Sequence, residues 1–385
     1  MSIANPLEEL TLADLRGRTS VKWRLHPPDV LPAFIAEMDV PLAEPVVRAV
    51  TDAVRRGDTG YAFGDAYAEA LAAFASQRWG WDGLDVGRTL MVADVMTGLT
   101  EVVGLVTAPG SRVVVSTPVY PPFFDFMAKT GREVREAPLG EDGRLDLDAL
   151  GAAFEDAVAG GGPAAYLLCN PQNPAGVAHT RTELAAVAEL ARSYGVRVVS
   201  DEIHAPIVLD GATFTPYLSV DGSDDAFAVL SASKAWNLAG AKAAVVAAGP
   251  SAYADLARMP EVVGHGASQL GLIAHTAALR EGGGWLDAVL RGLEENRDHL
   301  AKELDARLPA VRWVPSEATY LGWLDCRALD LGDDPASVLL ERGRVALSGG
   351  LPYGTGGAGH ARVTFATSRA ILSEVVERMA AAVAG

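Results

Sequence analysis

The sequence predicts an α/β fold, with helices covering a mostly parallel sheet in a large domain and a smaller α+β domain after it. Short apolar runs rich in β-branched residues alternate with Ala-rich segments of helical periodicity, the pattern expected of a parallel sheet wrapped by helices. The runs are apolar almost throughout, as are strands buried on both faces. A chain of 385 residues also has room for two or three domains.

Six apolar runs are the predicted strands of this sheet. Among the helical segments between them, residues 183–195 carry clear boundary signals. Thr180 and Thr182 are suitable N-caps, and Gly195 suits the position just after a last helical turn. The predicted strands span residues 89–93, 112–116, 164–169, 196–200, 226–231 and 243–248.

The chain changes character after about residue 280. A long helical stretch over 284–307 leads into mixed strands and helices, as in an α+β domain. The first residues are Pro-rich and irregular, so we expect them to pack on this smaller domain. The Gly-rich stretch 348–360 is interpreted as a mobile loop, with an ordinary glycine-rich turn as the alternative. The predicted division is an N-terminal segment (1–45), a large domain (46–280) and a small domain (281–385).

Composition argues against several classes of function. The chain has 32 basic and 49 acidic residues, a formal net charge of −17, whereas a nucleic-acid surface needs clustered positive charge. Its two cysteines, Cys169 and Cys326, provide neither a disulfide framework nor a metal cluster. No apolar stretch reaches the roughly 20 residues that span a bilayer, and the N-terminus does not resemble a signal peptide. We therefore expect a cytoplasmic protein.

Lys234 is the first residue that indicates chemistry. It lies in the run S-A-S-K, residues 231–234, directly after a predicted buried strand, where lysine is rare unless it is paired or chemically used. A lysine amine can form a Schiff base with an aldehyde cofactor. The hydroxyls of Ser231 and Ser233 suit a phosphate group, and Lys242 suits its charge. Taken alone, the motif is equally compatible with a solvated loop lysine.

Polar residues also follow two other predicted strands. Asp201 and Glu202 come directly after residues 196–200, and carboxylates at the carboxyl end of a parallel strand face the crevice where such folds bind ligands. A carboxylate there can pair with a protonated pyridine nitrogen, although a helix N-cap is the alternative. Asn173 lies in the turn N-P-Q-N-P-A-G after residues 164–169. It could donate to a phenolic oxygen or simply form a turn.

Tyr120 and Arg362 complete the set of candidates. Tyr120 lies just past residues 112–116, between prolines, where its ring could stack on a cofactor ring or form a rigid surface turn. Arg362 lies in A-R-V-T-F near the C-terminus. A guanidinium recognises a carboxylate through two parallel hydrogen bonds, but a single arginine in a strand is often structural.

The order of these motifs resembles the fold-type I pyridoxal 5′-phosphate (PLP) enzymes, the aspartate aminotransferase superfamily, over about residues 20–380. The shared motifs are N-P-x-N-P-x-G, S-D-E, S-x-S-K and R-x-x-F. Finer details resemble its MalY/PatB-like branch, the cystathionine β-lyases that cleave C–S bonds. These details are Lys22–Trp23, A-E-M-D at 36–39, T-G-Y at 59–61, T-P-V-Y-P-P-F at 117–123 and D-E-I-H at 201–204.

The resemblance implies a role for each residue and a homodimer with shared active sites. Lys234 carries PLP and moves the Cα proton, Asp201 pairs with the pyridine nitrogen, and Tyr120 stacks on the ring; these three are the predicted catalytic residues. Arg362 binds the substrate carboxylate. The remaining cofactor-binding residues are Asn173 at O3′, His204, Ser231, Ser233 and Lys242, the backbone of Val95 and Met96, and Tyr61, which reaches the phosphate of the neighbouring subunit.

Four positions depart from the usual patterns of these enzymes. Many aminotransferases carry Tyr three residues after the aspartate and Arg eight residues after the lysine, where this chain has His204 and Lys242. His204 suits the lyase branch, although a packed histidine without a catalytic role is the alternative. Asp94 replaces the first glycine of the phosphate turn, and Glu37 replaces an aspartate.

The branch resemblance predicts β-elimination from cystathionine or a related S-substituted cysteine, which yields a thiol, pyruvate and ammonia. Transamination by a class I/II aminotransferase is the alternative, because both reactions share their first steps and the fold does not decide between them. A specialised PLP enzyme of secondary metabolism is a third candidate. A non-catalytic DNA-binding regulator on this fold is disfavoured by the acidic charge.

Overall fold

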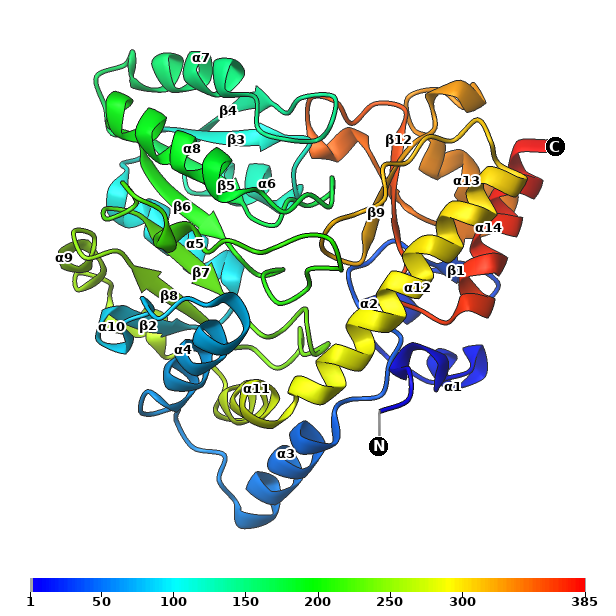
Figure 1. Ribbon diagram of the computed structural model, residues 1–385, viewed down its shortest axis with the longest axis horizontal. Helices are drawn as coiled ribbons and strands as arrows, with labels where there is room; N and C mark the ends of the chain where they lie inside the picture. Colours follow the sequence, from blue (N-terminus) through cyan, green and yellow to red (C-terminus); the bar gives the residue numbers. More distant parts are fainter. Residues whose placement is uncertain (1–2, 385) are drawn as a thin grey trace.

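A seven-stranded sheet forms the centre of the larger part of the molecule, as the computed structural model, which describes residues 3–384, shows (Figure 1). The strand order is β2-β8-β7-β6-β5-β3-β4. Among the strands of this described sheet, β8 alone runs opposite to the other six, so it is antiparallel to both β2 and β7. The strands are β2 (Thr89–Val92), β3 (Arg112–Thr117), β4 (Glu133–Pro138), β5 (Ala165–Cys169), β6 (Arg197–Asp201), β7 (Phe227–Leu230) and β8 (Ala244–Ala248).

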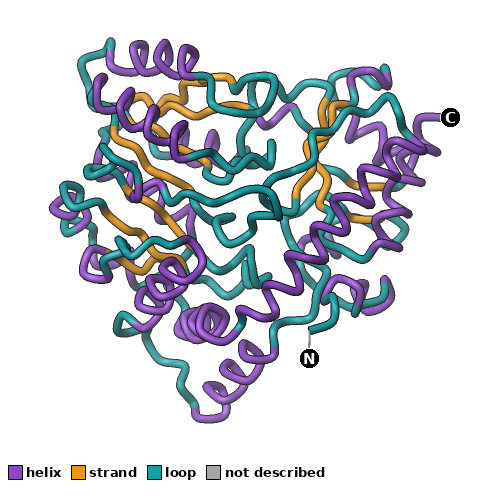
Figure 2. The backbone as a smooth tube through the Cα atoms, in the orientation of Figure 1, coloured by secondary structure: helices purple, strands orange, loops and turns teal. Residues whose placement is uncertain are grey.

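Helices cover both faces of this sheet because its side chains alternate between two apolar layers. Val113 and Val115 belong to one buried cluster, and Val114 belongs to another. Helices α5, α6, α9 and α10 pack on the first face, and α4, α7, α8 and α11 cover the second (Figures 1 and 2). With α3 and two short 3-10 helices, these elements are α3 (Glu44–Arg56), α4 (Ala66–Trp79), η2 (Val86–Arg88), α5 (Val95–Val106), α6 (Pro122–Lys129), α7 (Leu147–Val158), α8 (Arg181–Tyr194), η3 (Tyr217–Ser219), α9 (Tyr253–Leu256), α10 (Glu261–Gly264) and α11 (Gln269–Glu281).

The C-terminal part is built on a small antiparallel sheet of order β11-β12-β9. The long helix α12 packs against α14, which also contacts α13. In Figure 1, α12 crosses the front of this part beside α14. The elements are α12 (Gly283–Arg307), β9 (Leu321–Asp325), η4 (Arg327–Leu329), α13 (Pro335–Gly343), β10 (Val345–Ala346), β11 (Ser348–Gly349), η5 (Leu351–Tyr353), β12 (His360–Thr364) and α14 (Arg369–Ala384).

The N-terminal segment packs on this C-terminal part. Its strand β1 pairs with β10 in parallel, and the backbone N–H of Asp39 donates to the Ala366 carbonyl at 2.9 Å. Lys22 and Asp39 form a fully buried ion pair at 2.8 Å. The division of the chain into domains at residues 45 and 280 stays a prediction. The N-terminal elements are η1 (Pro6–Glu8), α1 (Leu12–Arg16), α2 (Val21–Arg24) and β1 (Leu31–Pro32).

All six predicted strands are present, and α8 begins and ends where its capping residues indicated. Thr180 forms a capping box with Glu183, and Gly195 has a φ of +68°. The seventh strand, β4, was missed because its sequence E-V-R-E-A-P lacks an apolar run. Within residues 3–384 it is an edge strand whose one partner is β3, and an unpaired edge tolerates charge.

The Gly-rich stretch 348–360 packs against the larger part of the molecule. The Tyr353 carbonyl accepts a hydrogen bond from the Val119 N–H at 2.9 Å, and Glu136 accepts one from the Thr355 N–H at 2.7 Å. Gly354 has a φ of +84°, and a Cβ there would lie 2.7 Å from the Phe124 ring. Glycine is therefore required by close approach. No helix in the described part of the chain has the length and apolarity to cross a membrane.

Candidate active site

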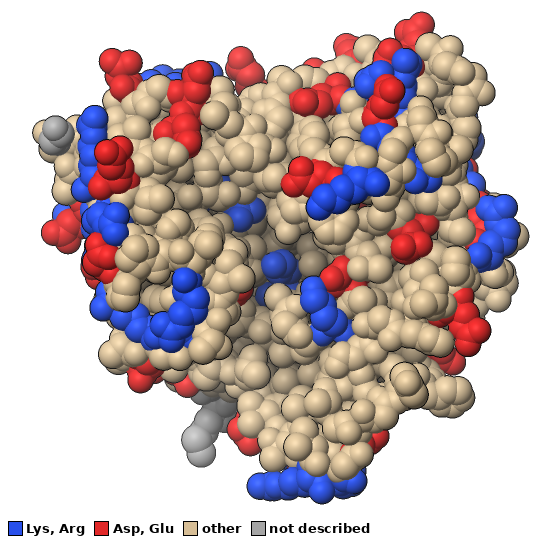
Figure 3. Space-filling view, turned by 180° about the vertical axis from the view of Figure 1, so that it is seen from behind, with Lys and Arg blue, Asp and Glu red and all other residues tan. Residues whose placement is uncertain are grey.

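Most of the predicted site residues lie at one edge of the large sheet, where the carboxyl ends of its parallel strands meet. Tyr120 follows β3 and Asn173 follows β5. Asp201 ends β6 and Lys234 follows β7. Because β8 is antiparallel, its amino end lies at the same edge, which brings Lys242 there as well. Open α/β sheets bind their ligands at this edge. Figure 3 shows a hollow near the middle of one face, with basic side chains inside it.

Lys234 lies in a tightly held loop after β7. The Ser233 N–H donates to the Ser231 hydroxyl at 3.1 Å, and the Ala232 N–H donates to the Tyr67 hydroxyl at 3.2 Å. The half-buried Lys234 amine donates to the Ala36 carbonyl at 3.0 Å. Burial lowers the pKa of Lys234 to about 8, and the nearby positive charge of Arg362 contributes. The amine is therefore much easier to deprotonate than an ordinary lysine.

Asp201 is a buried carboxyl group beside that lysine. Its side chain is 4 % exposed and accepts one hydrogen bond, from the Ile203 N–H at 3.0 Å. Burial raises the pKa of Asp201 to about 7, while the Ile203 N–H and Lys234 act in the opposite direction. The neighbouring Glu202 accepts from the Tyr217 N–H at 2.7 Å and from Ser200 at 3.1 Å. Glu202 is therefore engaged in the protein interior.

Arg362 and Asn173 are in direct contact. The Arg362 guanidinium donates to the Asn173 Oδ1 at 3.0 Å and to the Phe34 carbonyl at 2.9 Å. It also lies over the Tyr353 ring, 5.5 Å from its centroid. The Arg362 Nε is buried and has no partner among the described residues. The structure thus holds a buried guanidinium, with an unused donor, beside the predicted cofactor residues.

Tyr120 and His204 border the same group of charges. Burial raises the pKa of the half-buried Tyr120 hydroxyl, with Arg362 and Asp201 close enough to influence it. His204 is 2 % exposed, and its Nδ1 has no partner within residues 3–384. Burial, together with the positive charges of Lys234 and Arg362, holds the pKa of His204 well below its ordinary value. Its imidazole is therefore neutral.

The phosphate-binding roles of the predicted residues stay predictions, and in this structure Ser231 and Lys242 have other partners. The Ser231 hydroxyl already donates to the Ala243 carbonyl at 2.8 Å, so its proton is not free for a phosphate oxygen in this arrangement. Lys242 is paired with Asp94 at 2.7 Å. Ser233 lies in the same loop, and Val95 and Met96 begin α5, where backbone N–H groups have no helical partner.

Tyr61 lies far out on the surface of the single chain. It is 95 % exposed, and Phe63 beside it is 96 % exposed. Both belong to the connection between α3 and α4. The described structure of one chain therefore does not bring Tyr61 into the site with the other predicted residues.

Sequence reasoning missed several residues that hold this site in place. The Asn237 side chain accepts from the Met38 N–H and donates to the Met38 carbonyl, both at 2.9 Å, and its φ of 57° is left-handed. The buried Tyr320 hydroxyl donates to Ala36 at 3.0 Å, the same carbonyl that Lys234 contacts. A local signal existed for Asn237 alone, which stands three residues after Lys234. The Tyr320 and Ala36 contact depends on packing alone.

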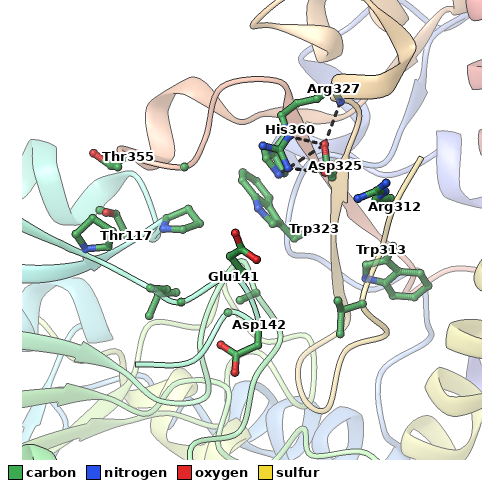
Figure 4. Close-up of a pocket in the computed structure, with 18 residues that line it drawn as sticks. Thr117, Glu141, Asp142, Arg312, Trp313, Trp323, Asp325, Arg327, Thr355 and His360 are labelled. Atoms are coloured by element: carbon green, nitrogen blue, oxygen red, sulfur yellow. Dashed lines mark hydrogen bonds and ion pairs between the residues drawn. The ribbon is translucent and has the colours of Figure 1, made fainter. Parts of the chain in front are cut away.

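A separate cavity of about 570 Å³ lies between the two parts of the molecule (Figure 4). None of the predicted cofactor or substrate residues lines it. Figure 4 shows Trp323 projecting into it toward Glu141, with His360 alongside. The Trp323 and His360 rings are stacked with centroids 5.2 Å apart, and Trp323 also contacts Tyr353 at 5.0 Å. The Tyr353 ring thus contacts both Trp323, which lines this cavity, and Arg362.

Comparison with known proteins places the chain in a family. Residues 44–379 match the family described as "Aminotransferase class I and II". The chain is 56 % identical, over 98 % of both chains, to the "Putative cystathionine beta-lyase" of Mycobacterium leprae (strain TN). It is 34 % identical to the cystathionine beta-lyase of Corynebacterium glutamicum, over 96 % of this chain and 98 % of that one.

A solved structure agrees with these sequence comparisons. The "putative plp-dependent beta-cystathionase" from Corynebacterium diphtheriae superposes with a TM-score of 0.92 at 35 % identity, covering 98 % of this chain and 99 % of that one. The half-buried Lys234 and the buried Asp201 thus lie at the carboxyl edge of a sheet in a fold shared with this protein. The chain belongs to the aminotransferase class I and II family.

Proposed function

We propose that this protein is a PLP-dependent C–S β-lyase that cleaves cystathionine or a related S-substituted cysteine. The relatives at 56 % and 34 % identity carry the names of cystathionine β-lyases, and the C. diphtheriae protein is described as PLP-dependent. Likeness of fold alone does not decide the reaction, so the site must fit the cofactor and the substrate.

The observation that carries this proposal is a buried carboxyl group and a lysine amine that lie near one another at the carboxyl edge of the sheet without forming an ion pair. Within residues 3–384, neither Asp201 nor Lys234 lies within ion-pair distance of an opposite charge. A buried carboxylate is costly without a cationic partner, and a protonated pyridine nitrogen would supply that partner to Asp201. An aldehyde cofactor would engage the Lys234 amine. The donors of Ser233, Lys242 and the first turn of α5 suit a phosphate.

Bound PLP would supply an electron sink for the charge that develops at the substrate Cα. Lys234 acts as the base. A pKa of about 8 leaves about a tenth of its amine neutral at pH 7, and this amine accepts the Cα proton once the substrate has displaced Lys234 from the cofactor. The Arg362 guanidinium binds the substrate α-carboxylate, with Asn173 fixing its orientation. Tyr120 covers the site, and the neutral His204 adds no charge to it.

Elimination then follows if the β-carbon of the substrate carries sulfur. The Cβ–S bond breaks with its electron pair on sulfur, which gains a proton and leaves as the thiol. Water completes the balance: the S-substituted cysteine and one water give the thiol, pyruvate and ammonium. Transamination would instead return the proton to the cofactor and would require a 2-keto acid.

The test is to incubate the purified protein with L-cystathionine and measure pyruvate and free thiol. We expect equal amounts of both, without any dependence on an added 2-keto acid. Absence of pyruvate from any cysteine conjugate, with amino transfer to a 2-keto acid in its place, would overturn the lyase proposal in favour of an aminotransferase.

We also propose a homodimer in which Tyr61 reaches the phosphate of the neighbouring subunit. The support is the almost complete exposure of Tyr61 and Phe63, since large aromatic side chains exposed together mark interaction sites. Exposed Val47, Val54 and Val262 add apolar surface. The proposed location is the cytoplasm, consistent with two buried, unpaired cysteines.

A further inference from the structure

Two residues that depart from the family patterns at separate points of the sequence are partners in the structure. The Lys242 ammonium contacts one carboxylate oxygen of Asp94 at 2.7 Å. The other oxygen of Asp94 accepts the Thr97 N–H at 2.8 Å and so caps helix α5. The lysine that replaces an arginine and the aspartate that replaces a glycine therefore form one contact.

This pair lies at the phosphate end of the candidate site. Asp94 directly precedes Val95 and Met96, whose backbone was predicted to hold the phosphate, and Lys242 directly precedes Ala243, which accepts the Ser231 hydroxyl. Asp94 is also close enough to Tyr120 to influence its pKa. The pair thus borders the residues that were predicted to hold the phosphate.

Lysine and arginine differ in how they hold a phosphate. The arginine fork matches two phosphate oxygens and is rigid, whereas lysine is a point charge on a flexible stem. A flexible lysine loses more side-chain freedom when it binds, so an anchor that orders it beforehand favours binding. Asp94 is such an anchor, because the Thr97 N–H fixes it. An ammonium has three donors, so two remain after the contact with Asp94.

We propose that Asp94 is a positioning residue for the phosphate of the cofactor. It holds the Lys242 ammonium beside the first turn of α5, so that the ammonium and the backbone N–H groups of that turn bind one phosphate group. This inference rests on the proposed function, since it requires PLP. It predicts that the Asp94 charge strengthens cofactor binding, although a carboxylate by itself repels a phosphate.

The competing explanation is an exposed ion pair that serves only the fold. Lys242 is 52 % and Asp94 34 % exposed in their side chains, and such pairs contribute little to stability. Asp94→Asn separates the two roles, because asparagine caps helices as well as aspartate does but carries no charge for Lys242.

The experiment measures binding of PLP and of pyridoxal, which lacks the phosphate, to the cofactor-free protein by absorbance titration. We expect Asp94→Asn to weaken PLP binding roughly three- to tenfold and to leave pyridoxal binding unchanged. Asp146→Asn is the matched control: Asp146 caps α7 through Asp148 and Ala149 and should change neither affinity.

A second set of variants tests whether the two residues act as a unit. If Asp94 works through Lys242, the double variant Asp94→Asn with Lys242→Met should bind PLP no more weakly than Lys242→Met alone. In a Lys242→Arg background, Asp94→Asn should cost less than twofold, because the guanidinium fork is already ordered. Full additivity of the first two substitutions would overturn the inference.

The remaining outcomes are equally decisive. The inference fails if Asp94→Asn binds PLP as tightly as the wild type or more tightly, or if it weakens pyridoxal binding to the same extent. In those cases PLP still binds the wild-type protein, and the proposed function stands. A wild-type protein that binds no PLP at Lys234 would overturn the proposed function and this inference with it.

Discussion

The two ends of the candidate site contain the same kinds of charge in opposite settings. Asp201 is buried and Lys234 half-buried, and the pKa values of both are displaced to about 7 and about 8. Asp94 and Lys242 at the phosphate end are partly exposed and neutralise one another at 2.7 Å. Burial makes an unpaired charge costly, whereas solvent makes a paired one inexpensive. We call the end with Asp201 and Lys234 the ring end. Its buried, unpaired carboxyl group is suited to a positively charged partner, whereas at the phosphate end the ion pair fixes the position of the Lys242 side chain.

The largest effect is expected from removing the lysine at the ring end. Lys234→Ala should lower pyruvate release by at least roughly 10³-fold, because a positioned base contributes that much, and should abolish the absorbance of bound cofactor. Thermal unfolding of the cofactor-free variant would test whether the variant folds like the wild type. Lys302→Ala, which removes an exposed lysine on α12, is the control and should retain activity. Substantial activity in Lys234→Ala would contradict the proposed mechanism.

The contrast between the two aspartates predicts opposite pH dependences of stability. The pKa of Asp201 is raised from 3.8 to about 7, so the folded state holds a proton that the unfolded chain has lost between these values. The stability this group contributes is complete below about pH 4 and is lost as pH rises to about 7. Relative to the wild type, cofactor-free Asp201→Asn should therefore gain up to ~4 kcal/mol between pH 4 and pH 8.

Asp94 is the comparison, because its pKa is lowered; although burial opposes the shift, Lys242 and the Thr97 N–H outweigh it. Its contribution is present above the ordinary pKa and is lost as pH falls. Asp94→Asn should therefore lose stability relative to the wild type at neutral pH and converge with it in acid. Denaturant unfolding of both variants across this pH range measures the two trends, and parallel trends would refute the contrast.

A third prediction asks whether the phosphate end is completed by a second chain. Tyr61→Ala and Lys234→Ala should each be poorly active alone. If sites are shared, a mixed dimer has one site with both Lys234 and Tyr61 intact. Random exchange makes half the dimers mixed, so activity should approach about a quarter of the wild-type value. No recovery on mixing, with light scattering showing dimers, would mean that Tyr61 serves its own chain or no site.

The sequence predicted candidate site residues that lie at the ends of strands, but it did not predict contacts that depend on the packing of distant segments. Asp201, Asn173 and Tyr120 were predicted from their places after apolar runs, and the structure brings them to one edge because parallel strands end there. Their roles toward a cofactor stay predictions. Tyr320 was not found, because its contact with Ala36 joins positions 284 residues apart, and no local pattern encodes such a contact. Asp94 and Lys242 were noticed separately, but their pairing spans 148 residues and required the fold.

The role of Ser231 shows a different limit. Its motif indicated a phosphate ligand, yet its hydroxyl donates to the Ala243 carbonyl at 2.8 Å. A serine at this point can serve the phosphate or the adjoining strand. The position of that carbonyl shows its partner in this structure, and its role toward a phosphate stays a prediction. The type of residue was therefore predictable from the sequence, but its hydrogen-bond partner was not.

The smallest effect is expected at the carbonyl that Lys234 shares with Tyr320. The Lys234 amine and the Tyr320 hydroxyl each donate to Ala36 at 3.0 Å, so Tyr320→Phe leaves that carbonyl one donor. The expected loss of stability is about 1 kcal/mol, measured by urea unfolding of the cofactor-free protein, with kcat/KM lowered less than about threefold. Tyr353→Phe, which loses a hydroxyl contact with Ser348 at 3.0 Å, is the matched control. A loss of activity in Tyr320→Phe approaching that of Lys234→Ala would mean that anchoring of the N-terminal segment, rather than the buried charges, governs the ring end.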